Sequence, residues 1–530
     1  MKNKKSLFMT VTFLALGALV GCKKLPPPPP VVSSGIESSE PGEVTERTEI
    51  EFWTGFGAAV NNVLEPLIER FETENPNIKV DYETKQGYDN LTTAIKQSVS
   101  NRKYPHIANG YPDHFADYAN SSVLLNLDNN NYINNPNHGV DIDRYYDDFM
   151  VENKTIIDGY TVGLPFNKST EILVANQSFF DVANKLDPTV KVPETWQELA
   201  VIGPKLKQIA IDNGWFGKLV KDDGTTMNKP LDPTEQSLRD TAFDMTNVND
   251  PKNFIPFNWD SKSNFFITIL RQWDSVYTER GQDFHTGYVR FQEAENKDKT
   301  VAALQFMQDL FNANVIGIPD TFGEGLYGSK PFREGRTVLT ISSSAGIKEN
   351  VPNANEYKFD VSVNPILYNA EQPNRKAVIS QGTNLALFTQ GDARTDKGKN
   401  ERLAAWKLLR FLTYEVNHEF GKGTSYFPVT DGSKLSEGEE GYEDYVLYRN
   451  FLDSEGGTLN DIAIRDTANV NDAIYMPEEH NWIKFVDPAF IGSTEIRAEI
   501  ENAMSYLFDG DTPEQVINKL INDLPTYVQK

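Results

Sequence analysis

The sequence contains a single cysteine, Cys22, among its 530 residues. One cysteine excludes an intramolecular disulfide, a cysteine-type zinc site and a thiol nucleophile in the body of the protein. Histidine is also scarce. The six histidines are scattered along the chain and lack the spacing of zinc ligands. We therefore expect neither a metal site nor a cofactor, and a fold that rests on hydrophobic burial alone. A chain of this length ordinarily divides into two or more domains.

Positive charge is in the minority, with 51 Lys and Arg residues against 76 Asp and Glu residues and a net charge of −25. Nucleic acids are bound by clustered cations that release counterions, so this balance argues against nucleic acid as a partner. It also weighs mildly against a highly anionic ligand, unless a local basic pocket overrides the global field. An acidic surface of this size keeps a protein soluble in a crowded environment.

Several catalytic motifs are missing. No Gly-x-x-x-x-Gly-Lys-Ser/Thr loop is present, so the chain does not hydrolyse ATP by that route. The motifs His-Glu-x-x-His and Gly-x-Ser-x-Gly, typical of zinc proteases and serine hydrolases, are absent too. The segment Asp128–Asn131 is similar to the start of a calcium loop but lacks the required Gly and Glu, so we interpret it as a turn. These absences favour a protein that is not an enzyme.

The chain begins with the pattern of an export signal, in which lysines precede the short apolar stretch Leu7–Val20. This stretch is shorter than the roughly 20 apolar residues of a membrane span. The tetrapeptide Leu19–Cys22 resembles a bacterial lipobox. That resemblance implies a signal peptide over residues 1–21 and a Cys22 that carries diacylglycerol, with an acyl chain such as palmitate on its amine. An ordinary secretory signal with an incidental cysteine is the alternative.

Residues 22–47 predict a tether. Five consecutive prolines, Pro26–Pro30, favour an extended polyproline conformation. The stretch from Val31 to about Arg47 is rich in Ser, Glu and Thr and too poor in apolar residues to fold. Such a tether would hold the folded body away from the membrane.

The body starts with alternating strand and helix patterns. A strand pattern over Thr48–Trp53 is followed by apolar residues at helical spacing from Val60 to Phe71. A second strand, a second helix and a short third strand follow before Tyr111. This order predicts an α/β fold with a parallel sheet and right-handed crossovers. Ligands of such sheets lie beyond the carboxyl ends of the strands, where Trp53 and Tyr111 stand.

The middle of the chain, from about residue 193 to 319, has mostly helical patterns and predicts a second lobe. Within it, the polar segment 218–253 is punctuated by Gly and Pro and predicts an insertion or a long surface loop. Strand patterns return at 336–341, 358–363 and 376–387.

Several short segments, in this order, resemble the family 1 extracellular solute-binding proteins. These are the sugar-binding receptors of bacterial ABC importers, including the maltose and glycerol-3-phosphate receptors. Each fragment alone is a weak signal, but their order behind a lipobox and a tether is specific. The segments are Phe52–Thr54, Gln86–Tyr88, Gly163–Glu171, Trp259–Ser261, Ile341–Gly346, Ser380–Asn384 and Thr424–Pro428.

The resemblance implies two α/β lobes that are joined by hinge strands and close around a ligand in a central cleft. The crossings are expected near 163–168 and 379–385. We accordingly predict an N-terminal lobe of residues 48–165 plus 333–380 and a C-terminal lobe of residues 166–332 plus 385–530. The resemblance also implies two permease subunits and a separate ATPase as partners, and a monomeric receptor on the extracytoplasmic face of the cell membrane.

A sugar ring favours a flat aromatic surface beneath it and small hydrogen-bonding side chains around its edge. Each candidate also has a structural interpretation, since an aromatic near a strand end is often core and a serine often caps a helix. The predicted ligand-binding residues are the aromatics Trp53, Tyr88, Tyr111, Trp259 and Tyr426, and the polar residues Asp113, Asn167, Ser343, Gln381 and Thr383.

We therefore expect a receptor that binds a carbohydrate or related polyol for an ABC importer and does not change it. A surface glycoside hydrolase is the first alternative, because no pair of catalytic carboxylates stands out or can be excluded among so many acidic residues. An adhesive or signalling lipoprotein on the same fold is the second.

Overall fold

The computed structural model describes residues 42–212, 254–324, 327–352, 359–475 and 482–525. It also describes the backbone of two short strands, β5 (Leu219–Val220) and β6 (Thr226–Met227). The predicted export signal, Cys22, the tether up to residue 41 and the rest of the predicted insertion lie outside the described residues. Within the described part of the chain, no helix is both long enough and apolar enough to cross a membrane.

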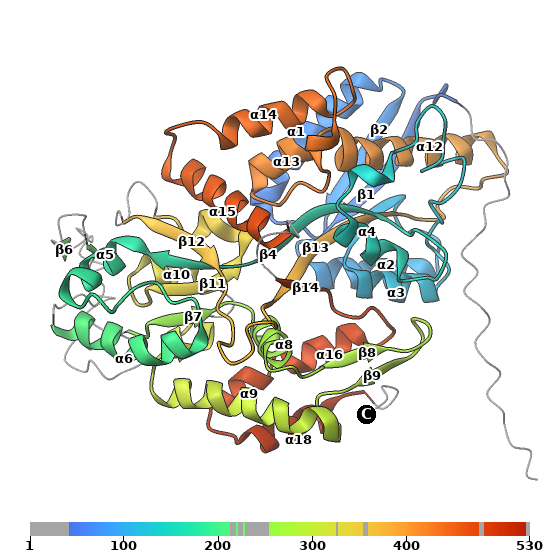
Figure 1. Cartoon of the computed structure of the whole chain (residues 1–530). Coiled ribbons are helices and arrows are strands. Elements are labelled where there is room, and N and C mark those ends of the chain that lie inside the picture. Colours follow the sequence, from blue (N-terminus) through green and yellow to red (C-terminus); the bar gives the residue numbers. More distant parts are fainter. Residues whose placement is uncertain are drawn as a thin grey trace, which may run out of the picture.

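A curled ten-stranded sheet connects the whole molecule, in the order β10-β7-β11-β4-β13-β3-β1-β2, with β12 also paired to β4 and β14 to β13 (Figure 1). A separate hairpin joins β8 (Thr278–Arg280) and β9 (Gly287–Val289). The strands of the large sheet are β1 (Thr48–Thr54), β2 (Ile78–Thr84), β3 (Ile107–Gly110), β4 (Leu164–Asn176), β7 (Phe257–Trp259), β10 (Ile316–Gly317), β11 (Leu339–Ser343), β12 (Val361–Pro365), β13 (Ala377–Leu387) and β14 (Ile483–Phe485).

Helices cover this sheet on both faces (Figure 1). They are α1 (Ala58–Glu74), α2 (Tyr88–Val99), α3 (Pro112–Asn120), α4 (Asp147–Lys154), α5 (Gln177–Leu186), α6 (Trp196–Asp212), α8 (Lys262–Gln272), α9 (Ala294–Asn312), α10 (Ser329–Arg333), α11 (Ile347–Asn350), α12 (Asp396–Arg410), α13 (Asn417–Thr424), α14 (Tyr442–Leu452), α15 (Leu459–Tyr475), α16 (Ser493–Ile500), α17 (Ala503–Phe508) and α18 (Pro513–Asp523).

The first five elements confirm the predicted strand and helix patterns. Strand β1 pairs in parallel with both β2 and β3. The predicted apolar stripe of α1 is its buried face, since Leu64, Leu67, Ile68 and Phe71 are all buried. The helix ends before Pro76, whose ring cannot continue it.

Two long strands, β4 and β13, connect an upper half of the molecule to a lower half (Figure 1). The first part of β4 pairs with β13, and its second part pairs with β11 and β12 of the lower half. Strand β13 in turn pairs with β3 of the upper half. The register of the β4–β13 pair shifts between Thr383 and Asn384. The predicted crossings near 163–168 and 379–385 fall on these two strands.

The predicted division of the chain between the halves is wrong for two segments. Residues 333–380 were expected in the N-terminal lobe, but β11 pairs with β7 and with the second part of β4 in the lower half. Residues 385–530 were expected in the C-terminal lobe, but α12 packs on β1 and α13 packs on α1 in the upper half. The reason is that β13 carries the chain back to the upper half. Helices α16–α18 pack with α8 and α9 in the lower half.

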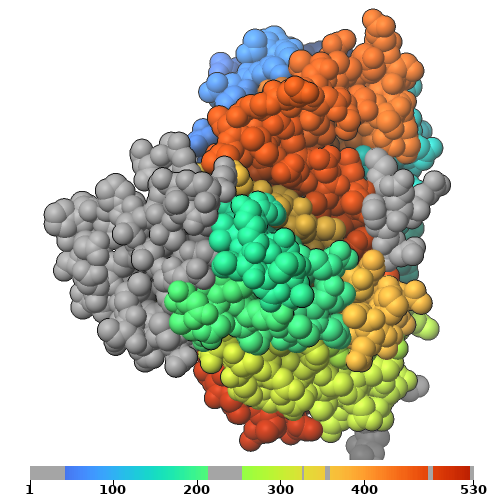
Figure 2. Space-filling model, turned by 60° about the vertical axis from the view of Figure 1, so that its left-hand side comes forward, coloured from blue at the N-terminus to red at the C-terminus, as the bar shows by residue number. Residues whose placement is uncertain are grey.

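Each half is therefore assembled from segments that are far apart in the sequence. Figure 2 shows the blue N-terminal segment beside the orange segments that follow residue 400 at the top of the molecule. At the bottom of the same view, the yellow-green segment near residue 300 lies against the red C-terminal part.

Candidate functional site

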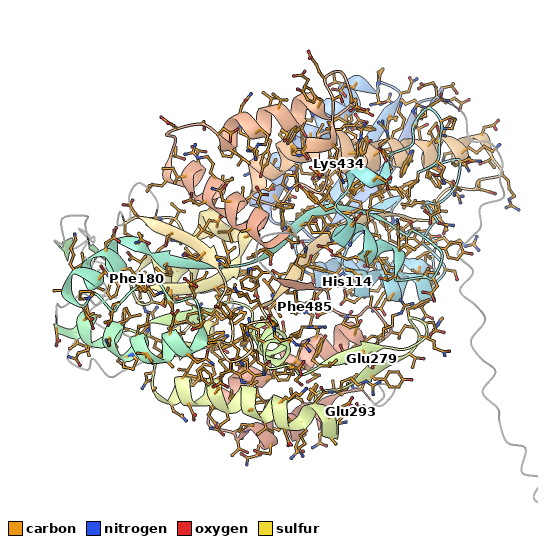
Figure 3. The ribbon with its side chains drawn as sticks, viewed as in Figure 1. His114, Phe180, Glu279, Glu293, Lys434 and Phe485 are labelled. Atoms are coloured by element: carbon orange, nitrogen blue, oxygen red, sulfur yellow. The ribbon has the colours of Figure 1, made fainter. Side chains whose placement is uncertain are left out.

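A cleft lies between the two halves and consists of two adjoining cavities of about 670 and 420 Å³. Both cavities are lined by Tyr88, Tyr111, Gln381 and Glu501. Helices α2 and α3 contribute the upper wall, and β11, α8 and α16 contribute the lower wall, while β4 and β13 supply residues between them. In Figure 3, His114 of α3 and Phe485 of β14 lie in the middle of the view, where the two halves meet.

Three tyrosines from the upper half line the cleft: Tyr88, Tyr111 and Tyr426. Tyr88 begins α2, and Tyr111 caps α3 directly after β3, so the ends of local elements place both rings. The centroids of these two rings are 5.0 Å apart, with their planes at 69°. Burial raises the pKa of all three hydroxyls, so each stays protonated and both donates and accepts hydrogen bonds.

The lower half contributes a carboxylate, Glu171, from strand β4. The side chain is held through one oxygen, Oε1, which accepts hydrogen bonds from Trp259 Nε1 at 2.8 Å and Asn264 Nδ2 at 2.9 Å. The residue is only 1% exposed, and its other oxygen, Oε2, has no hydrogen-bond partner among the described residues. Burial raises the pKa of Glu171 to about 7, because desolvation outweighs these two hydrogen bonds.

A second carboxylate, Asp260, follows β7 and lines the same cavity. Its Oδ1 accepts hydrogen bonds from the Gly328 backbone N–H at 2.5 Å and from Asn258 Nδ2 at 3.2 Å. Burial raises the pKa of Asp260 to about 7 as well. The cleft therefore contains two carboxyl groups that titrate near neutral pH.

The smaller cavity contains the one arginine that lines the cleft within the described residues, Arg497 of α16. Its guanidinium forms an ion pair with Asp487 and donates to Asn264 Oδ1. On the opposite wall, Asp113 Oδ2 accepts a hydrogen bond from Thr494 Oγ1 at 3.0 Å, which joins α3 of the upper half to α16 of the lower half.

A sequence profile of the bacterial extracellular solute-binding proteins matches residues 66–449, which is most of the chain. The chain belongs to this family. Its members are binding proteins that act outside the cytoplasm, so the predicted family, the extracytoplasmic location and the prediction of a receptor rather than an enzyme are confirmed.

Curated relatives of this solute-binding protein include the sn-glycerol-3-phosphate-binding periplasmic proteins UgpB of Shigella dysenteriae and Escherichia coli. Each is 23% identical to it over 417 residues, which are 76% of this chain and 78% of the relative.

Solved structures confirm the two-lobed α/β fold. An ABC substrate-binding protein from Listeria monocytogenes in complex with cycloalternan matches with a TM-score of 0.60 and 16% identity. A maltose/maltodextrin-binding domain from Bdellovibrio bacteriovorus bound to maltotriose matches with a TM-score of 0.58 and 15% identity. Both matches cover 90% of this solute-binding protein and 98% of the other chain.

Six of the ten predicted ligand-binding residues line the cleft of the solute-binding protein, and their role in binding stays a prediction. They come from α2, α3, β11, β13 and the segment after α13, so the fold brings together positions up to 338 residues apart in the chain. These six are Tyr88, Tyr111, Asp113, Ser343, Gln381 and Tyr426.

The other four lie elsewhere. Trp53 is half-buried at the end of β1 under Lys85, whose Nζ is 3.8 Å from the ring centroid. Trp259 is fully buried and stacks on Phe265 with a centroid distance of 4.5 Å. Asn167 and Thr383 are fully buried and hydrogen-bonded to each other across β4 and β13. Trp259 still serves the site, because it holds Glu171.

Sequence reasoning missed the carboxylates of the larger cavity. Asp260 could have been found, because it follows the strand β7 and lies beside the predicted Trp259. Glu171 could have been found by alternation, since it shares one face of β4 with the hinge residues Ser169 and Asn167. Glu501 follows the end of α16 and carried no sequence signal.

Proposed function

We propose that this protein is the solute receptor of an ABC importer and captures a carbohydrate or related polyol in the cleft between its halves. The observation that carries the proposal is the cleft itself, in which tyrosine rings face carboxylate, amide and hydroxyl groups. The halves would close about β4 and β13 and release the ligand unchanged to two permease subunits served by a separate ATPase. The relatives that bind glycerol-3-phosphate, cycloalternan and maltotriose support a hydroxylated ligand.

The chemistry of the cleft suits such a ligand. Tyrosine rings offer flat apolar faces to the C–H groups of a sugar, while their hydroxyls bind its edge. Ser169, Ser343 and Gln381 line the same cavity, and their side chains can both donate hydrogen bonds to hydroxyl groups and accept them. A cavity of about 670 Å³ is within the size range of small-molecule sites.

We propose that residues 1–21 are removed, that Cys22 is lipidated and that residues 22–47 tether a monomeric body to the extracytoplasmic face of the cell membrane. The export signal, the Leu-Val-Gly-Cys tetrapeptide and the proline run support this arrangement. Two or more acyl chains anchor a protein stably, since each buried methylene contributes about 0.8 kcal/mol.

The test is a thermal-shift screen of residues 23–530, which include every described residue, against neutral, amino and phosphorylated sugars. A ligand present at 100 times its Kd should stabilise the protein by about 2.7 kcal/mol. Tyr88→Ala should weaken binding at least about tenfold, equivalent to about 1.4 kcal/mol, and Tyr288→Ala on β9, outside the cleft, should not. Failure of every sugar to stabilise the protein contradicts the proposal, and the appearance of new reducing ends from an oligosaccharide would indicate a hydrolase instead.

A further inference from the structure

Acidic side chains give the larger cavity an excess of negative charge among the described residues. Four acidic residues line it: Glu171, Asp260, Glu349 and Glu501. None of the described residues that line this cavity is a lysine, arginine or histidine.

One cation next to the cavity, Arg333, forms an ion pair with the cavity residue Glu349, with Nη1 3.8 Å from Oε2, whereas three others are engaged elsewhere. Arg497, which lines the smaller cavity, forms an ion pair with Asp487. Lys262 follows the cavity residue Ser261 but its Nζ is 2.9 Å from Asp320 Oδ2. Lys348 precedes Glu349 but donates to the Gly423 backbone carbonyl at 2.6 Å. The cleft thus carries negative charge that is available to a ligand.

The unsatisfied polar atoms of the cleft are all hydrogen-bond acceptors. Glu171 Oε2, Gln381 Oε1 and Asn350 Oδ1 line the larger cavity, are buried and lack a partner among the described residues. Asp487 Oδ1, in the smaller cavity, is also buried and lacks a hydrogen-bond partner among the described residues. The orientation of the Asn350 amide is set by its Nδ2, which donates to Ser342 Oγ at 2.9 Å. A buried acceptor without a donor is energetically unfavourable, so these atoms favour a ligand rich in hydrogen-bond donors.

These observations separate three ligand classes. A phosphate or carboxylate brings acceptors and negative charge to a site that already has both. A neutral sugar supplies hydroxyl donors but leaves the carboxylates of Glu171 and Asp260 without a counter-charge. An ammonium group supplies up to three donors and a positive charge, and the rings of Tyr88 and Tyr111 add favourable cation–π surfaces.

Building on the proposed receptor function, we propose that the ligand is a hydroxylated solute with a protonated amine, such as an amino sugar, whose ammonium binds between Glu171 and Asp260. Burial raises the pKa of both carboxyls to about 7, and a bound ammonium would lower both pKa values by stabilising the charged forms. Trp259 and Asn264 both donate to Glu171 Oε1 and so fix the orientation of the carboxylate. Its Oε2 has no hydrogen-bond partner among the described residues and can accept a hydrogen bond from the ammonium.

The test compares sugars that differ at one position, by isothermal titration calorimetry on residues 23–530 at pH 7.5. Glucose, glucosamine and N-acetylglucosamine form one set, cellobiose and the corresponding amino and N-acetyl disaccharides form a second, and galactose with galactosamine a third. Glucose 6-phosphate and glycerol 3-phosphate are the anionic probes. In at least one set, the amine form should bind at least 10-fold more tightly than its hydroxyl or acetamide counterpart, and the anionic probes should not bind.

Two variants test the assigned residue. Glu171→Gln keeps the shape and one acceptor but removes the charge, so it should weaken binding of the amine at least 10-fold and leave any neutral sugar unaffected. Glu279→Gln on β8, at the surface of the lower half (Figure 3), is the matched control and should change neither affinity. A neutral or phosphorylated sugar that binds as tightly as the amine overturns this inference but leaves the receptor function standing. Absence of binding by every class counts against both.

Discussion

At the scale of single residues, the buried carboxyl of Glu171 couples the stability of the ligand-free protein to pH. Its folded pKa of about 7 lies above the ordinary value of 4.5, so between these pH values the folded state binds a proton that the unfolded state does not. The contribution of Glu171 to stability therefore falls as pH rises from about 4.5 to about 7. The groups that face it are Trp259, Asn264, Arg497 and Asp260.

Glu171→Gln should remove this dependence, because glutamine does not titrate. The variant should equal the parent near pH 4.5 and exceed its free energy of unfolding at pH 8 by on the order of 3 kcal/mol, since one pKa unit corresponds to about 1.4 kcal/mol. Urea unfolding of both proteins across this range measures the difference. A difference that stays constant with pH would show that the carboxyl does not titrate near neutrality.

The hinge contains a fully buried ion pair, in which Lys168 Nζ of β4 lies 2.5 Å from Glu152 Oε2 of α4 and 3.3 Å from the Gly382 carbonyl oxygen of β13. Burial lowers the pKa of Lys168 and raises that of Glu152, and their attraction opposes both shifts. The pair ties α4 of the upper half to the two crossing strands.

Lys168→Met should destabilise the protein by about 3–5 kcal/mol, because it leaves the Glu152 carboxylate buried without a counter-charge. Adding Glu152→Leu should recover most of that loss, since two apolar side chains replace the pair. Lys79→Met, which breaks an exposed pair with Glu72, should cost no more than about 1 kcal/mol. Chemical denaturation of the four proteins compares them, and a double variant less stable than Lys168→Met would contradict this account.

At the scale of elements, the β4–β13 crossing depends on a glycine. Gly382 has a φ of +98°, and a Cβ at this position would lie 1.8 Å from the Asn167 carbonyl oxygen. The strands therefore approach each other closely where the register shifts between Thr383 and Asn384. A side chain here would push the two strands apart.

Gly382→Ala should lower the free energy of unfolding by more than about 1 kcal/mol, because it adds both backbone strain and a steric clash. Gly346→Ala is the matched control in the same cleft, since a Cβ there meets nothing within 4 Å and its φ is −92°. Its effect should stay within about 0.5 kcal/mol. Thermal unfolding of both variants decides the point, and equal effects would contradict the role of the crossing.

At the scale of the whole molecule, direct hydrogen bonds connect the two halves. Besides the bond between Asp113 and Thr494, the Arg280 guanidinium next to the β8–β9 turn donates to the Ile156 carbonyl oxygen at 3.2 Å. These contacts need α3 and α16 to lie close together, and they stabilise a closed arrangement of the halves.

Thr494→Val keeps the shape of the side chain but removes its hydroxyl, and should shift the ligand-free protein toward an open form. Small-angle X-ray scattering should then give a larger radius of gyration, and ligand affinity should fall about two- to tenfold, as expected for one lost hydrogen bond. Thr73→Val on the exposed face of α1 is the control. An unchanged radius together with unchanged affinity would show that this contact does not hold the halves together.

Local patterns in the sequence were enough for the elements that form by short-range contacts. The strands and helices from β1 to β3 follow from the spacing of apolar residues, and Tyr111 follows from the rule that ligands lie at strand ends, whereas Trp53, predicted by the same rule, does not line the cleft. Trp259 shows the limit of that rule. Alternation along β7 directs Trp259 into the core and leaves the next residue, Asp260, at the cleft.

Long-range packing decided the rest, because it depends on contacts that no sequence window contains. The return of α12 and α13 to the upper half follows from how β13 pairs with both β3 and β4. The character of the cleft has the same origin. Glu171, Asp260 and Glu501 are distant in the chain, and only the fold, which brings them to one cavity, distinguishes them from the other carboxylates among 76 acidic residues. Composition alone suggests that an acidic protein is well solvated, whereas the folded chain places Glu171 and Asp260 in one cavity, where burial raises the pKa of both carboxyls.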